Sequence, residues 1–252
     1  MNRTRGFFGL VALLGVLLAL SVATAARATV DDFDRALSTM SLSSHDRILA
    51  AISTGLEQSG FPADNLLALV QQLGAISGSA EEKEMILLLF TRYLESGMPI
   101  SGLLPIGFDL ANALQEGVPI ESVLLEALKG IAQGSPISVI EAGISQRLTL
   151  LLSVRDLLFS RGVFRVPAGT AQSSANALPE TRFDELVDQI ADALSDYLEG
   201  GGGPFDGEAM YALVSDRLGK LPASLVTSED VALVLSVIGP SDLTQIALAA
   251  LT

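Results

Sequence analysis

Apolar side chains recur at helical spacing along most of the chain. Between residues 120 and 132 they fall at positions i, i+3, i+4, i+7, i+8 and i+11, which places them on one face of an α-helix. They are Ile120, Val123, Leu124, Ala127, Leu128 and Ile131. Sustained alternation of polar and apolar residues, which is typical of strands, is absent. We therefore predict an all-α protein with helices at 44–58, 63–73, 80–95, 105–115, 120–132, 137–160, 181–198, 207–219, 228–238 and 241–251.

Four Gly-x-Pro motifs separate consecutive predicted helices, and each forms a corner between them. Glycine suits the left-handed residue that ends a helix, whereas proline prevents continuation of that helix and fits the first turn of the next. The corners are Gly60 and Pro62, Gly97 and Pro99, Gly117 and Pro119, and Gly134 and Pro136. We predict that each corner turns the chain back, so that the helices form antiparallel hairpins.

The predicted hairpins suggest how the chain is organised. A helix with one apolar face cannot bury that face alone, so the hairpins of residues 29–162 are expected to stack into an irregular bundle or a short helical-repeat array. Residues 163–179, VFRVPAGTAQSSANALP, lose the helical period and are rich in Ala, Ser, Gly and Pro, which is typical of a linker. Residues 180–252 form a C-terminal helical region, in which Gly200–Gly203 is a flexible connector.

The first 28 residues have the features of an export signal. Arg3 and Arg5 precede an apolar stretch over residues 6–20, and Ala26 and Ala28 supply the small residues of a cleavage site. We predict a signal peptide at 1–28, cleaved after Ala28, and a periplasmic or secreted product. The alternative is a retained membrane anchor, because the apolar stretch approaches the roughly 17 to 25 residues of a spanning helix.

Composition and net charge argue against some classes of binding partner. The 252 residues include no cysteine, so the protein has neither a disulfide nor a lipoprotein anchor, and its stability must come from packing. The predicted signal holds three of the 15 basic residues and none of the 29 acidic ones, which leaves a net charge of −17. Such a charge repels phosphate backbones and anionic lipid headgroups, so we predict no nucleic-acid partner and membrane contact only through a retained signal.

The corners at 117 and 134 also carry a family resemblance. The stretch GVPIESVLLEALKGIAQGSPISVI resembles the pattern G-[VL]-P-x-x-x-L-L-x-x-x-L-x-G-[LI]-A-x-G-x-P-x-x-x-[IV] of signal-bearing bacterial α-helical proteins that have no assigned activity. The matching residues are Gly117, Pro119, Leu124, Leu128, Gly130, Ile131, Ala132, Gly134, Pro136 and Ile140. The resemblance covers about residues 97–160, and it implies an exported helical-repeat protein with no catalytic residues to transfer.

The single histidine lies in a segment that superficially resembles a catalytic triad. In SLSSHDRIL, Ser43 and Ser44 precede His45 and Asp46 follows it. Neighbours on a helix point in different directions, whereas the members of a Ser-His-Asp triad converge from separate positions. We interpret Ser43 or Ser44 as a helix N-cap and Asp46 as a first-turn residue.

Acidic residues offer no recognisable metal or catalytic motif. One histidine and no cysteine do not make the usual zinc site. Asp31, Asp32 and Asp34 lack the spacing of an EF-hand loop, and we interpret them as a solvated acidic tail. The remaining clusters are interpreted as solvated helix faces and comprise Glu81, Glu82, Glu84, Asp184, Glu185, Asp188, Asp192 and Asp196. We predict no catalytic residue, no metal ligand and no cofactor.

These features favour an exported, non-catalytic helical protein that presents a binding surface to a protein partner. We place that surface on the repeat array at 97–160, where corner loops vary without disturbing the stack. Two alternatives stay open. One is a carboxylate-dependent hydrolase acting on cell-envelope polymers, which requires two carboxylates in different environments. The other is a membrane-anchored helical envelope protein.

Overall fold

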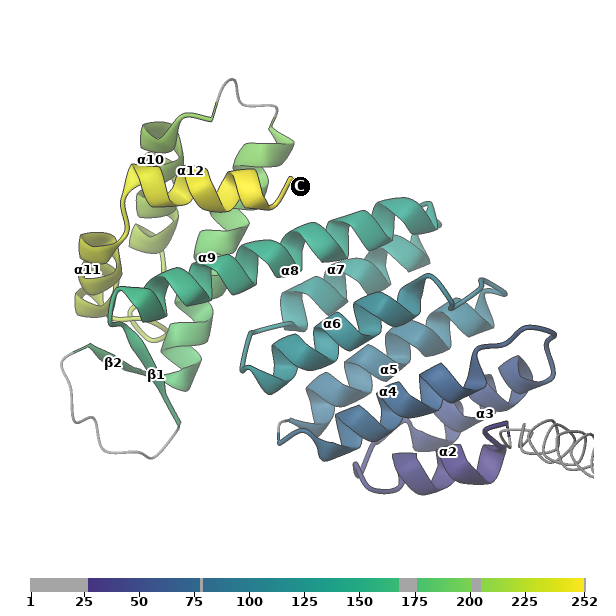
Figure 1. The fold of residues 1–252 in the computed structure, drawn as a ribbon. Helices are drawn as coiled ribbons and strands as arrows, with labels where there is room; N and C mark the ends of the chain where they lie inside the picture. Colours follow the sequence, from purple (N-terminus) through teal and green to yellow (C-terminus); the bar gives the residue numbers. More distant parts are fainter. Residues whose placement is uncertain (1–26, 78, 168–175, 201–204, 252) are drawn as a thin grey trace, which may run out of the picture.

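The computed structural model describes residues 27–77, 79–167, 176–200 and 205–251 (Figure 1). These residues form eleven α-helices and two short β-strands, so the all-α prediction is confirmed. The helices are α2 (Val30–Leu37), α3 (His45–Leu56), α4 (Ala63–Ala75), α5 (Ala80–Glu95), α6 (Leu103–Gln115), α7 (Glu121–Ala132), α8 (Ile137–Ser160), α9 (Glu180–Glu199), α10 (Gly207–Gly219), α11 (Ser228–Val237) and α12 (Pro240–Ala249). The strands are β1 (Phe164–Val166) and β2 (Ala177–Pro179).

Helices α2 to α8 stack in two layers (Figure 1). Within one layer α3 packs on α5 and α5 packs on α7; within the other, α2, α4, α6 and α8 pack in sequence. Contacts of α2 with α3, α5 with α6 and α7 with α8 join the layers. The apolar stripe of each helix therefore faces the opposite layer, and Leu89, Tyr93 and Leu110 are among its fully buried side chains.

Glycine ends three of these helices with the same geometry. Gly97, Gly117 and Gly134 have φ angles of 70°, 73° and 72°, in the left-handed region. After each one, the next backbone N–H donates to the carbonyl five positions earlier, as Val118 does at 2.9 Å. This bond closes the last helical turn. Gly162 ends α8 in the same way without a following Gly-x-Pro motif, so glycine alone suffices for this corner.

The acidic N-terminal segment is a helix, so the prediction of a tail over Asp31, Asp32 and Asp34 is wrong, although Asp31 and Asp34 are exposed as predicted. Phe33 and Leu37 are four residues apart on one face of α2 and are fully buried. The backbone N–H of the N-cap residue donates to the Asp32 carboxylate (3.0 Å), which stabilises the first turn. The two buried side chains and the cap thus help to hold these eight residues against α3 and α4.

The residues around the predicted cleavage site touch the fold. The guanidinium of Arg27 donates to the carbonyl of Phe61 (3.2 Å), and the backbone N–H of Ala28 donates to the carboxylate of Asp64 (2.9 Å). Ala26 lies outside the described residues. Cleavage after Ala28 stays a prediction.

The segment interpreted as a linker contains ordered structure. β1 and β2 pair in parallel, with Arg165 opposite Leu178, and Val163 and Leu178 are buried. Strands of three residues show no measurable period, and their pairing spans residues 168–175, which lie outside the described residues. The local sequence pattern therefore did not predict this small sheet. Its strand β1 places Arg165 next to α9.

The C-terminal helices pack on the repeat array through α8. This helix contacts α6 and α7, and also α9 and α12 (Figure 1). The ion pair between Arg161 and Asp242 (2.7 Å) adds a polar contact between the end of α8 and the start of α12. Leu243 and Ala247 of α12 are fully buried. The region after residue 180 is therefore packed against the array.

Among the described residues, α8 alone is a single helix long and apolar enough to cross a membrane by length and composition. The pair α11 and α12 passes the same criterion together but is bent by 80°. In the fold, α8 is covered by four helices, and its Arg147 and Arg155 are buried in ion pairs. These contacts hold α8 within the fold.

The corner glycines provide a matched test of this geometry. Left-handed backbone costs an L-residue about 1–2 kcal/mol, so Gly134→Ala should lower the free energy of unfolding by roughly that amount. A Cβ at Gly134 meets no atom within 4 Å, whereas at Gly117 it would lie 2.6 Å from Nη1 of Arg165. Gly117→Ala should therefore cost more, as measured by urea denaturation. Equal losses would show that Arg165 is not held against this corner.

Candidate functional site

A cleft of about 490 Å³ lies where α5, α7 and α9 begin, beside the corner at Gly117 and Pro119. We call it the acidic cleft. Its charged lining consists of Glu82, Glu116, Glu121, Arg165, Glu180 and Asp184. Glu116 pairs with Arg155 (2.6 Å), but Arg155 also pairs with Asp156 (2.7 Å), so the lining has five carboxylates around one guanidinium and a formal charge of −4.

The ends of separate elements bring these side chains together. Glu82 lies in the first turn of α5, Glu121 begins α7, and Glu180 begins α9. A helix N-terminus carries partial positive charge, which favours a carboxylate there. Asp184 follows one turn into α9, and β1 supplies Arg165. Residues remote in sequence thus form one site because three helices start at the same edge of the fold.

Arg165 organises the side of the cleft formed by α9. Its Nε and Nη2 donate to the two carboxylate oxygens of Asp184 at 2.8 and 2.9 Å, and Nη2 lies 2.5 Å from Glu180. Such a two-point contact fixes both position and orientation. Both oxygens of Asp184 therefore accept hydrogen bonds from Arg165. The charges of Glu82 and Glu121, which also line the cleft, are balanced less fully by Arg165.

The electrostatics of the cleft follow from this imbalance. Burial and the nearby Asp184 carboxylate raise the pKa of Glu82 above its ordinary value, despite the attraction of Arg165. Burial likewise raises the pKa of Asp184, outweighing its ion pair with Arg165. A raised carboxyl pKa means that the ionised form is disfavoured in the fold. A cation that entered the cleft would therefore relieve existing repulsion.

The rest of α9 is held by a ladder of aspartates, so their interpretation as a merely solvated face is wrong. Asp184, Asp188, Asp192 and Asp196 are spaced four residues apart and share one side of the helix. Each one contacts an arginine from another element. The partners come from three other elements, β1, α8 and α10.

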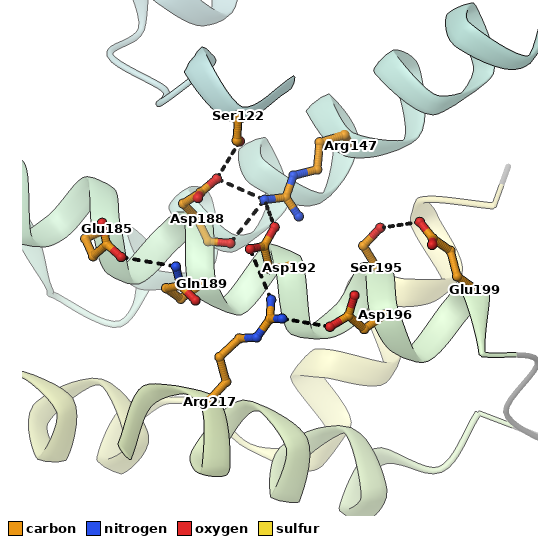
Figure 2. A network of polar contacts seen from close by, with 10 residues as sticks. All are labelled: Ser122, Arg147, Glu185, Asp188, Gln189, Asp192, Ser195, Asp196, Glu199 and Arg217. Atoms are coloured by element: carbon orange, nitrogen blue, oxygen red, sulfur yellow. Dashed lines mark hydrogen bonds and ion pairs between the residues drawn. The ribbon is translucent and has the colours of Figure 1, made fainter. Parts of the chain in front are cut away.

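Figure 2 shows the central part of this ladder between α8 and α10. Nη2 of Arg147 on α8 lies 2.9 Å from Asp188 and also pairs with Asp192, while Ser122 of α7 donates to Asp188 at 2.7 Å. Arg217 of α10 contacts Asp192 (3.1 Å) and Asp196 on the opposite side. This network fixes α9 relative to three other helices, and hence fixes Asp184 at the cleft.

The triad-like segment has a structural role. Nε2 of His45 lies 3.2 Å from Asp34 on α2, and Nδ1 lies 3.3 Å from Asp46. The backbone N–H and hydroxyl of Ser43 donate to Glu84 at 2.8 and 2.6 Å. Ser44 is at the N-cap position of α3 but makes no side-chain capping bond.

The predicted corners differ in their relation to the cleft. Gly117 and Pro119 line it. Gly97 and Gly134 end helices elsewhere, and Gly60 lies in the turn between α3 and α4. Sequence reasoning missed Arg165, because it falls within the interpreted linker. Within the described ranges, no three His, Cys, Asp or Glu side chains are grouped as metal ligands.

Comparisons with family models, curated proteins and solved structures give no match for this chain. The family resemblance of residues 97–160 therefore stays a prediction. The case for a function rests on the chemistry of the cleft.

The buried arginine of the ladder should matter more than the exposed one. Arg147 is 7% exposed, and Arg147→Met would leave Asp188 and Asp192 without it, so we expect a loss of about 2–3 kcal/mol in the free energy of unfolding. Arg217 is 29% exposed, and Arg217→Met should cost about 1 kcal/mol or less. Urea denaturation compares the two. Equal losses would contradict a dominant role for Arg147.

The raised pKa of Glu82 predicts a pH-dependent stability difference. A carboxyl whose folded-state pKa is raised contributes stability below its ordinary value of 4.5, and that contribution is lost as pH rises through the raised value. Glu82→Gln should therefore increase the thermal midpoint at neutral pH, and the gain should shrink toward zero as pH falls below about 4.5. The neighbouring, exposed Glu81→Gln is the control. Destabilisation by Glu82→Gln at neutral pH would refute the assignment.

Proposed function

We propose that the protein is an exported, non-catalytic helical protein that binds a protein partner through the acidic cleft, where a lysine or arginine side chain of the partner enters. The observation that carries this proposal is the excess of carboxyl groups over guanidinium groups in a cleft where burial and neighbouring carboxylates raise the pKa of Glu82. Export rests on the signal features of residues 1–28.

The cleft suits a cationic side chain for two reasons. Five carboxylates around one guanidinium attract a basic group and repel an acidic one. In addition, the walls are fixed before binding, because Asp184 is held by Arg165 and α9 is held by the ladder. A preformed site loses little side-chain entropy when it binds. The cleft also borders the 97–160 array at its Gly117 corner, which agrees with where we expect the partner.

A hydrolase acting on cell-envelope polymers is the second candidate. It is favoured by two carboxyl groups with raised pKa, Glu82 and Asp184, in one cleft, since acid–base pairs use such perturbed groups. It ranks second because both oxygens of Asp184 already accept from Arg165, so Asp184 has no free oxygen with which to act as the second member of an acid–base pair. Turnover of such a polymer that disappears in Glu82→Gln would reverse this order.

Binding is tested with the peptide KGKGK and isothermal titration calorimetry. We expect binding at low ionic strength that weakens above about 0.1 M salt, where the screening length falls to about 10 Å. Glu82→Gln and Glu121→Gln should each weaken binding roughly threefold to tenfold, since one favourable charge contact contributes about 1 kcal/mol.

Glu229→Gln, on α11, is the matched control because it changes the net charge equally outside the cleft. Equal weakening in all three variants would mean that the peptide senses only the overall negative charge. That result would remove the cleft as the binding site.

A further inference from the structure

The acidic cleft is one end of a longer surface shared by α5 and α7. These helices pack side by side and both begin at the acidic cleft. Their C-terminal halves line a second cleft of about 440 Å³, together with Arg47 of α3. The helices therefore run in the same direction between two clefts. Ten residues separate Glu82 from Arg92, which corresponds to about 15 Å along a helix.

The second cleft has the opposite charge. Arg47 makes a two-point contact with Glu95 at 2.8 and 2.7 Å, and Arg92 lies 3.4 Å from the same carboxylate. Two guanidinium groups thus share one carboxylate, which leaves a charge of +1. Arg92 is 53% exposed and makes only the longer contact, so it is available to a ligand. We call this the arginine cleft.

Apolar side chains connect the clefts. On α7, Glu121, Leu125, Leu128 and Ala132 follow one line at i, i+4, i+7 and i+11, from the acidic cleft to the arginine cleft. Leu125 is 54% exposed, although it lies between two charged ends. Met85 and Leu88 of α5 are partly buried beside this line. The surface is therefore negative at one end, apolar in the middle and positive at the other.

We propose that this surface binds an amphipathic helix of the protein partner, antiparallel to α5 and α7, with its basic last turn in the acidic cleft and its acidic first turn at Arg92. The inference rests on the proposed function and defines the partner. Its apolar face covers Leu125, Leu128 and Leu88.

Two physical arguments select a helix over an extended peptide. The backbone groups of α5 and α7 bond within their own helices, so a ligand over the apolar line finds no backbone partner there. An extended chain would leave its own N–H and C=O groups unpaired, whereas a helix satisfies them internally. The orientation follows because acidic first turns and basic last turns stabilise a helix through its dipole, and antiparallel dipoles attract.

The test uses two peptides of identical composition, each with leucines at i, i+3, i+4 and i+7 and a hydrocarbon staple on the outer face to equalise helicity. One has Glu in its first turn and Lys in its last; the other has these charges exchanged. By fluorescence anisotropy, the first should bind at least tenfold more tightly. Leu125→Ser should weaken it about tenfold and Arg92→Gln about threefold.

Leu248→Ser is the matched control, because Leu248 is 47% exposed on α12, outside both clefts. It should leave the affinity unchanged, and circular dichroism verifies that each variant is folded. The double variant Glu121→Lys with Arg92→Glu should largely abolish the preference between the peptides, because both ends of the surface then carry a negative charge.

Several outcomes would overturn the inference. Equal affinity for the two peptides, or undiminished binding by Leu125→Ser, would do so. If Glu82→Gln still weakened KGKGK in that case, the acidic cleft would remain a binding site and only the helical partner would be wrong. A dimer in sedimentation experiments that Leu125→Ser dissociates would instead assign the surface to a second copy of this chain.

Discussion

The position of α9 depends on the requirement that a buried guanidinium be surrounded by carboxylates. Arg147 projects from α8 into a place where only 7% of its side chain is exposed, and leaving it unpaired there would cost several kcal/mol. Asp188 and Asp192 satisfy it, and Ser122 donates to Asp188 from α7. Because α9 is rigid, this anchoring also places Asp184, one turn earlier, opposite Arg165. The geometry of the acidic cleft is thus a consequence of pairing elsewhere on the same helix.

Carboxylates on one helix serve different purposes, as Glu82 and Glu84 illustrate. Burial disfavours ionisation of Glu84, but hydrogen bonds from Ser43 and Ser44 outweigh it and lower its pKa. Glu82 faces other carboxylates, and its pKa is raised. Glu84 therefore stabilises the contact between α3 and α5, whereas Glu82 costs stability at neutral pH. Such unfavourable charge is typical of binding sites, where a ligand supplies the missing partner.

The sequence was informative where structure is local. The predicted bounds of α5 and α8 coincide with those observed, because a long one-sided apolar stripe and a terminal glycine or proline act within a few residues. The sequence pattern did not predict α2, which has only two buried side chains. It also did not predict β1 and β2, which pair although they are separated along the chain. Glu82 and Asp184 were recognised as acidic but interpreted as solvated. Their burial arises only when separate helices start at one edge, which no local pattern encodes.

The two-layer topology also explains why the α5–α7 surface has charged ends of opposite sign. When consecutive helices alternate between layers, every second helix runs in the same direction, so like ends gather at one edge. Each helix separately favours acidic residues in its first turn and basic residues in its last, as Glu82 and Arg92 of α5 show. When the helices stack, these local preferences give the α5–α7 surface acidic residues at one edge, basic residues at the other and apolar residues between them. A surface that discriminates the direction of a bound helix is therefore built from the same dipole rule that stabilises each helix alone.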